Sequence, residues 1–369
     1  TSPADNATGV AVDANIVLTF NESVDAESGN ITLFKTGGAT AETIAVGSGL
    51  VSVSGNVVTI NPNSPLDSAQ GYYVQIAASG FDDVAGNSFA GINDATTLNF
   101  TAADVAGPTL SSSTPADNAT GVAVDANIVL TFNENVVAGS GNITLKKSSD
   151  NSTVETMAVD GANVSISGAA VTVNPTANLD SSQGYYLQIA ATAFDDASGN
   201  SYAGINDTTT LNFTAADVVG PTMVITSTTS GVSSGAATND STINLTFTAN
   251  EAATGFVVGD ITVTGGSLSS FATVSSTVYT ATFTPSGAGA TTIDVAANKF
   301  TDAAGNNNSA ATQFTWTYDN VAPTMAITST TSGVSSGSTT NDSAINLTFT
   351  ANEAATGFAV GDITVNGGS

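Results

Sequence analysis

Short stretches in which hydrophobic and polar residues alternate recur along the chain. In NIVLTF the alternation puts Ile16, Leu18 and Phe20 on one face, and INLTF at residues 243–247 repeats the pattern. GYYVQIAA, VYTATF and TTLNF alternate in the same way. A period of two is the spacing of side chains on one face of a β-strand, and clusters of Gly, Asn, Asp and Pro separate the stretches. No segment shows the period of an amphipathic helix, so the pattern predicts an all-β chain.

The chain contains two kinds of internal repeat. PADNATGVAVDANIVLTFNE occurs at residues 3–22 and again at residues 115–134, and we call this repeat type A. PTM-x-ITSTTSGVSSG begins at Pro221 and at Pro323, and we call this repeat type B. A period of about 100 to 110 residues is the size of one immunoglobulin-like (Ig-like) β-sandwich. We therefore expect tandem Ig-like antiparallel β-sandwiches with these bounds: 1–107 (type A, truncated on its N-terminal side), 108–220 (type A), 221–322 (type B) and 323–369 (partial type B).

Both ends of the sequence interrupt a repeat. The AGPTLSSS that leads into the second type A repeat has no counterpart before Thr1, and the last type B repeat stops at Ser369. Half a sandwich leaves strand edges unpaired and a core open. We therefore expect residues 323–369 to be completed by another segment or to be poorly stable.

Each complete repeat ends in an Asp that lies four residues before a Pro. These linker residues are Asp104, Asp217 and Asp319. Such linkers are short, and Pro restricts the backbone further. We therefore expect the sandwiches to be arranged as a rod rather than as beads on a flexible string.

Two more acidic motifs accompany the linkers. The strand NIVLTF or INLTF ends in Asn-Glu, and an Asp-x-x-Gly-Asn motif precedes the last strand of each complete repeat. In an Ig-like sandwich both loops lie at the end of the domain that faces the preceding linker. We therefore expect linker Asp, Asn-Glu and Asp-x-x-Gly-Asn to meet at each junction. The predicted clusters are Asp104, Glu134, Asp196 and Asn200; Asp217, Glu251, Asp302 and Asn306; and, at the third junction, Asp319 with Glu353.

Oxygen-only clusters of this kind suit Ca²⁺, which takes about six to eight oxygen ligands. Zn²⁺ would require His or Cys, and the chain has neither. Carboxylates packed together without a cation repel one another unless one is protonated. The alternative is that Asp-x-x-Gly-Asn is only a tight turn, because Asp favours the start of a turn and Gly tolerates a positive φ. The convergence of three acidic motifs favours calcium at the junctions.

The charge balance of the chain excludes some classes of binding partner. Four Lys and no Arg or His stand against 31 acidic residues, a formal charge of −27. Phosphate binding needs basic residues, so the sequence excludes nucleic acid and anionic membranes as partners. The absence of Cys excludes disulfides. No apolar run of about 18 residues is present, and we expect no membrane-spanning helix.

The sequence does not predict an enzyme. A Ser or Cys triad needs a His, which the chain lacks. Neither a phosphate-binding Gly-x-x-x-x-Gly-Lys loop nor a dinucleotide fingerprint occurs. Acidic pairs such as Asp82 and Asp83 are copied from repeat to repeat, which argues against a single catalytic cleft.

At these motifs the chain resembles bacterial Ig-like domains. Type A resembles the S-layer kind, with IVLTFNE, NPTANLDSSQGYYLQIA and FDDASGNSYAG. Type B resembles Ig-like repeats of giant surface adhesins, with INLTFTANE, FTDAAGN and YDNVAPT. The resemblance implies stalk modules on a bacterial surface that are often rigidified by calcium between domains, with Asp104, Asp217 and Asp319 as the best ligand candidates.

We therefore expect an extracellular, cell-surface stalk or spacer of a bacterial adhesin or biofilm matrix protein, whose partners are the neighbouring repeats of its own chain. Two alternatives stay open. One is a self-assembling filament or S-layer subunit, completed by strand addition between copies. The other is a binding module for glycan or protein on the loops, against which the near-identity of the repeats counts.

Overall fold

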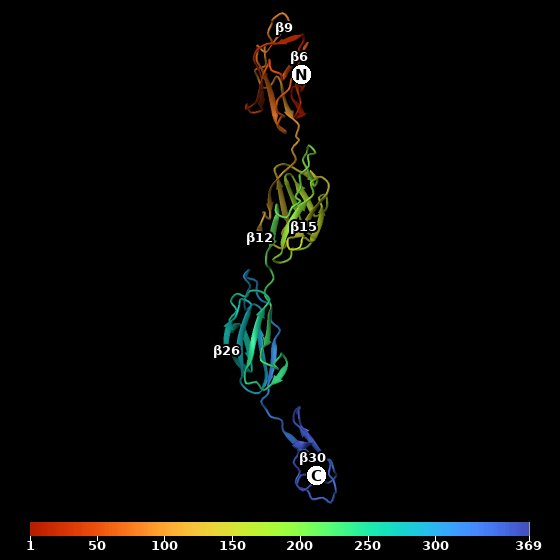
Figure 1. Cartoon of the computed structure of the whole chain (residues 1–369), viewed down its shortest axis with the longest axis vertical. Coiled ribbons are helices and arrows are strands. Elements are labelled where there is room, and N and C mark those ends of the chain that lie inside the picture. The colour runs from red at the N-terminus through yellow and green to blue at the C-terminus, as the bar shows by residue number, and fades with distance from the viewer. Residues whose placement is uncertain (369) are drawn as a thin grey trace. The chain divides into compact units, whose positions relative to one another are not determined.

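The computed structural model describes residues 1–368 as an all-β protein (Figure 1). The chain separates into two compact units, Thr1–Ala216 and Asp217–Ser369, which we describe one at a time. Within residues 1–368 no helix is long and apolar enough to span a membrane.

Unit 1 contains two β-sandwiches. In the first, one sheet has the order β2 (Ile16–Thr19), β7 (Val57–Ile60), β6 (Val51–Ser54). The facing sheet has the order β1 (Ala7–Val10), β10 (Asn99–Ala102), β8 (Gly71–Ile76), β4 (Asn30–Lys35), β5 (Thr40–Ala45). A short additional pair joins β3 (Val24–Ala26) and β9 (Phe81–Asp83).

The second sandwich of unit 1 has the same topology, as the type A repeat predicts, with one additional edge strand, β11. One sheet has the order β11 (Leu110–Thr114), β13 (Ile128–Phe132), β18 (Ala170–Val173), β17 (Val164–Ser167). The other has the order β12 (Ala119–Val122), β21 (Asn212–Ala215), β19 (Gly184–Ile189), β15 (Asn142–Lys147), β16 (Thr153–Ala158). The short additional pair is β14 (Val137–Ala138) with β20 (Phe194–Asp195).

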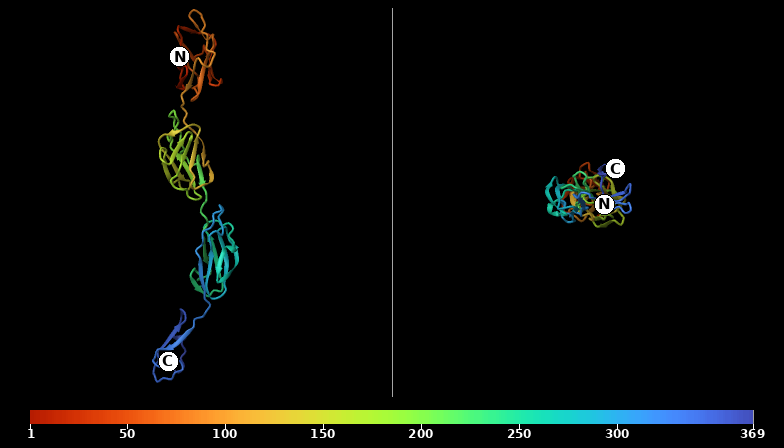
Figure 2. Two further views of the ribbon diagram at one scale, coloured as in Figure 1. Left: turned by 180° about the vertical axis from the view of Figure 1, so that it is seen from behind. Right: turned by 90° about the horizontal axis from the view of Figure 1, so that it is seen from below.

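Unit 2 begins with a third sandwich of two four-stranded sheets, and its strands can be followed from behind in Figure 2. The first sheet has the order β22 (Met223–Ser227), β24 (Ile243–Ala249), β27 (Val278–Pro285), β26 (Gly266–Thr273). The second has the order β23 (Ala236–Thr238), β29 (Phe314–Tyr318), β28 (Gly289–Val295), β25 (Ile261–Thr264). A 3-10 turn, η1 (Val258–Asp260), precedes β25.

The alternating pattern of the sequence is the packing pattern of the strands. In β13, Ile128, Leu130 and Phe132 are buried, and they belong to one hydrophobic core with residues of the facing sheet such as Leu187 on β19. Trp316 on β29 lies in the core of the third sandwich. Strand pairs are antiparallel, with one exception in each sandwich. The strand of a sheet that comes first along the chain pairs in parallel with the strand that comes last along the chain, in the pairs β1–β10, β12–β21 and β23–β29. The predicted fold class, tandem Ig-like β-sandwiches, is confirmed.

The partial type B repeat keeps only one strand pair in the part of the chain that the structure describes. This pair is β30 (Met325–Ser329) with β31 (Leu347–Ala351), followed by the 3-10 turn η2 (Val360–Asp362). Ile327 is 59% exposed, whereas its counterpart Ile225 is 8% exposed. The difference arises because a second sheet faces β22 and shares a core with Ile225, while no second sheet faces β30 and β31 within residues 1–368.

Candidate metal centre

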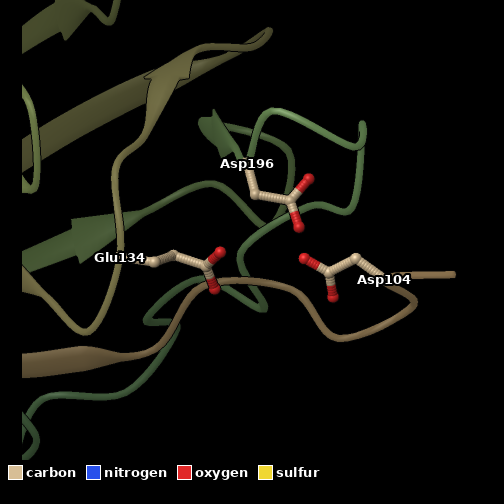
Figure 3. A group of neighbouring side chains, drawn as sticks. All are labelled: Asp104, Glu134 and Asp196. Carbon is tan, nitrogen blue, oxygen red and sulfur yellow. The ribbon is translucent and has the colours of Figure 1, made fainter. Parts of the chain in front are cut away.

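Three carboxylates from separate segments meet where the first linker of unit 1 enters the second sandwich. Asp104 follows β10, Glu134 follows β13 and Asp196 follows β20. One carboxylate oxygen of each residue lies within 4.8 Å of the other two. Figure 3 shows the three side chains pointing toward one another from three different backbone segments. The loops meet here because the strands that precede Glu134 and Asp196 end on the linker side of the sandwich.

The same arrangement occurs a second time, inside unit 2. Asp217, Glu251 and Asp302 each offer a carboxylate oxygen, and these oxygens also lie within 4.8 Å of one another. The second sandwich is type A and the third is type B, so two different repeat sequences build one arrangement. The structure thus brings together the three acidic motifs that the sequence places at the first two junctions.

The Asp-x-x-Gly-Asn motif is a tight turn, and it is also part of the cluster. Asp196 Oδ1 accepts backbone N–H groups from Ser198 and Asn200, both at 2.8 Å, and Oδ2 accepts the Asn200 side-chain amide at 2.8 Å. Gly199 has a φ of +88°, a conformation that suits glycine. Burial acts to raise the pKa of Asp196, but hydrogen bonds from the Asn200 side chain and the turn backbone outweigh it and lower the pKa. The turn therefore keeps a buried carboxylate ionised next to two others.

The Asn of this motif also holds the linker. Asn200 Nδ2 donates to the backbone oxygen of Asp104 at 3.1 Å, and Asn306 Nδ2 donates to the backbone oxygen of Asp217 at 3.1 Å. These contacts use the amide nitrogen of each side chain. Both Asn residues therefore hold the linker through these hydrogen bonds. That they also bind a metal ion stays a prediction.

Sequence reasoning missed the role of the Asn in Asn-Glu. Asn133 Oδ1 accepts the backbone N–H of Thr109 at 2.6 Å, and Asn250 Oδ1 accepts that of Thr222 at 2.6 Å. Each Asn thus fixes the chain just after the linker Pro, next to the Glu of the cluster. The repetition of Asn before Glu in both repeat types was the available sequence signal for this role.

The third predicted pair is not part of such a cluster. Within residues 1–368, Asp319 and Glu353 belong to no group of three acidic residues that could share an ion. The sequence after Glu353 contains no Asp-x-x-Gly-Asn motif. The Glu353 Oε1 atom is buried and has no hydrogen-bond partner among the described residues. These two residues remain predicted ligands without an observed third carboxylate.

Burial and the neighbouring carboxylates act together on the glutamate of each cluster. Burial, then the nearby charges of Asp196 and Asp104, raise the pKa of Glu134 above its usual value of 4.5. Burial, then Asp217 and Asp302, raise the pKa of Glu251 in the same way. Like charges at this separation disfavour ionisation of one member unless a cation is bound. The glutamate of each cluster is therefore easier to protonate than an isolated glutamate.

We predict that Glu134 titrates above pH 4.5 in calcium-free protein and that Ca²⁺ abolishes this shift. The pKa of Glu134 is raised in the folded protein, so protonation of Glu134 stabilises the folded state. This stabilisation is complete below the usual pKa of 4.5 and is lost as the pH rises through the pKa of the folded state. Asp196 has the opposite sign, since its lowered pKa gives stability above 3.8 that is lost as pH falls through the folded pKa. NMR titration of the carboxyl carbons measures both. A Glu134 pKa at or below 4.5 without calcium would contradict the proposed repulsion.

Family comparison agrees with the fold. A model of the bacterial Ig-like domain matches residues 1–102 and 104–215, and a second model with the same description matches residues 217–318. The matches cover most of the 369 residues. The chain belongs to the bacterial Ig-like domains. No curated protein sequence matches it.

Several solved structures are similar at low identity. The structure of surface-layer protein SbsC, domains 1–6, is 15% identical with a TM-score of 0.21, and the match covers 94% of this chain and 62% of that one. The N-terminal part of SbsC is 15% identical with a TM-score of 0.23, covering 57% and 44%. Invasin, a bacterial integrin-binding protein, is 12% identical with a TM-score of 0.29, covering 89% and 61%. The chain thus spans between 44% and 62% of the length of these structures.

Proposed function

We propose that the chain is part of an extracellular structural stalk of a bacterial surface adhesin or biofilm matrix protein, in which Ca²⁺ stiffens the junctions between sandwiches. The observation that carries the proposal is the recurrence of one three-carboxylate cluster, each time including the linker Asp. A cluster that recurs at successive linkers is expected for a mechanical role, whereas a catalytic role would require a single cleft. Membership of the bacterial Ig-like domains supports the cell-surface location.

The residues fit calcium by their chemistry. Asp104, Glu134 and Asp196 supply three anionic oxygens, and nearby backbone oxygens and water can supply the remainder of a coordination shell of about six to eight. Bound calcium would offset the repulsion that raises the pKa of Glu134. Extracellular calcium modules bind calcium with Kd values of about 10⁻⁴ to 10⁻³ M, so calcium at the concentrations found outside cells can occupy such sites.

The mechanical consequence follows from where the three ligands lie. Asp104 belongs to the linker, while Glu134 and Asp196 belong to the sandwich that follows it. An ion shared by the three would therefore fix the linker to that sandwich and reduce bending at the junction. We therefore expect the linkers at both clusters to bend less in calcium than in chelator.

A self-assembling filament or S-layer subunit is the second candidate. Its copies would be joined by strand addition at the edge of a sheet. Association that increases with protein concentration would support this candidate over an isolated stalk.

Small-angle X-ray scattering of the 369-residue chain, in Ca²⁺ and then in chelator, tests the proposed function. We expect chelation to reduce the maximum dimension and to give the scattering profile of a more flexible chain. The Glu134→Gln, Glu251→Gln double variant is the control and should show little response. A concentration series in the same experiment tests association. Wild-type profiles that are unchanged by chelation would reject calcium stiffening and leave the sandwich array intact.

A further inference from the structure

Ser68 of the first sandwich contacts the start of the linker directly. It lies in the loop between β7 and β8 and is half-buried. Its Oγ donates to Asp104 Oδ1 at 2.8 Å and accepts the backbone N–H of Val105 at 2.8 Å. One hydroxyl therefore makes two hydrogen bonds to two consecutive linker residues, one of which is in the acidic cluster.

Asp104 is held from the other side by the second sandwich. Its backbone oxygen accepts the Asn200 amide at 3.1 Å, and its carboxylate lies in the cluster with Glu134 and Asp196. A single linker residue is thus the place where contacts from the preceding sandwich and from the following sandwich meet. Of these contacts, the Ser68 hydroxyl is the side-chain group of the first sandwich that reaches the Asp104 carboxylate.

The loop that carries Ser68 is itself fixed to the last strand of the first sandwich. Ala69 has a φ of +56°, and its N–H donates to the backbone oxygen of Ala103 at 3.1 Å. The N–H of Ala102 donates to the backbone oxygen of Gln70 at 2.9 Å. On the other side of Ser68, the N–H of Asp67 donates to the hydroxyl of Tyr72 at 2.8 Å. Because the loop is anchored directly before and directly after Ser68, the hydroxyl is held in place relative to the end of β10.

We propose that Ser68 is the positioning residue that transmits ordering of the Asp104 carboxylate to the preceding sandwich. The proposal deepens the calcium function and rests on it only for the role of the ion. An ion held by Asp104, Glu134 and Asp196 fixes the linker to the second sandwich, and the Ser68 hydroxyl then fixes the first sandwich to the same carboxylate. Without the hydroxyl, calcium orders the linker but leaves the first sandwich free to reorient.

The type A repeat places a second serine in the corresponding position. DSAQG at residues 67–71 corresponds to DSSQG at residues 180–184, so Ser181 stands in the sequence where Ser68 does. Ser182, like Ala69, has a positive φ, of 58°, and its N–H donates to the backbone oxygen of Ala216 at 3.1 Å. The loop conformation that presents the serine is therefore built twice within unit 1.

Double electron–electron resonance measures the coupling in the complete chain. The sequence has no Cys, so Thr43→Cys and Thr156→Cys introduce the only two labelling sites, both on exposed positions of edge strands. The width of the label-to-label distance distribution is recorded in Ca²⁺ and in chelator for wild type, Ser68→Ala and Ser68→Thr. Ser52→Ala, at an exposed position away from the linker, is the matched control. Calorimetric titration gives the calcium affinity of each variant.

We expect calcium to narrow the distribution of the wild type, Ser68→Thr and Ser52→Ala. Ser68→Ala should stay as broad in calcium as in chelator, while its calcium affinity changes by about tenfold or less, since the single hydrogen bond that is lost is only partly buried. A narrow Ser68→Ala distribution in calcium overturns the proposal. If calcium does not affect the wild type but Ser68→Ala is still broader, the role of the ion fails and the positioning role of Ser68 stands. Equal widths for wild type and Ser68→Ala in both conditions overturn the positioning role whatever calcium does.

Discussion

Glu134→Gln is expected to stabilise the calcium-free protein and to weaken calcium binding. Without an ion, Glu134 adds a negative charge within 4.8 Å of the carboxylates of Asp104 and Asp196, and its pKa is raised by burial and by both neighbours. A neutral amide of similar size removes that repulsion. With calcium present, the same change removes an anionic ligand, and calcium affinity rises with the number of ligand charges. The two effects have opposite signs, which a purely structural role of Glu134 would not produce.

The size of the calcium effect follows from linkage. At a free calcium concentration about 100-fold above Kd, binding stabilises the folded state by about 2.7 kcal/mol. Loss of one ligand should weaken the affinity of the first junction by at least about tenfold, a change comparable with or larger than the effect of altering an outer-shell contact. At the same calcium concentration about half or more of the stabilisation would then be lost.

Thermal unfolding in calcium and in chelator checks this prediction. Asp160→Asn, which removes one exposed charge from the same sandwich, is the control and should leave the calcium-induced shift in Tm unchanged. Glu134→Gln should raise Tm in chelator and reduce the shift. A variant that is destabilised in chelator and keeps the wild-type shift would mean that the cluster does not bind calcium through Glu134.

Gly107→Ala is expected to separate the linker from the second sandwich. A Cβ atom at Gly107 would lie 2.2 Å from the backbone oxygen of Ser201, and one at Gly220 would lie 1.9 Å from that of Asn307. Both obstructing atoms belong to backbone directly after an Asp-x-x-Gly-Asn motif, so no side chain can rotate to make room. The turn that carries Asp196 must move away from Asp104, at a cost of about 1–3 kcal/mol for an overpacked contact.

Calcium affinity and unfolding free energy measure this displacement. We expect Gly107→Ala to lose most of the affinity of the first junction, because Asp104 and Asp196 would no longer reach one ion. Gly47→Ala is the matched control, since a Cβ there meets no heavy atom within 4 Å and its φ is not positive. Wild-type affinity in Gly107→Ala, with the control also unchanged, would show that the close approach of linker and turn has no part in binding.

The alternation of hydrophobic and polar residues and the internal repeats were enough to predict the fold. A period of two puts alternate side chains of a strand on the same face, and in β13 this face buries Ile128, Leu130 and Phe132. They also placed the three acidic motifs at one end of the second and third sandwiches, since strand direction decides where a loop lies.

The contacts of Ser68 and Gly107 could not be predicted, because they depend on how two loops approach one another. Nothing in DSAQG says that a hydroxyl will reach a residue that lies 36 positions away. The Gly-Pro of the first two linkers is replaced by Ala322 and Pro323 in the third, which was a usable signal for close approach at Gly107 and Gly220. The parallel pairing of β1 with β10 was likewise absent from the prediction, since a short strand that begins a repeat carries no mark of its partner.

Calorimetric titration of the chelator-treated, 369-residue chain with CaCl₂ tests the central claim most directly. The clusters at Asp104 and Asp217 predict two saturable sites, of which Glu134→Gln weakens one and Glu251→Gln weakens the other. Two sites that respond separately to the two variants would establish calcium at both junctions. The absence of saturable binding, or binding that neither variant changes, would contradict the account and would leave the acidic clusters as turns of the fold.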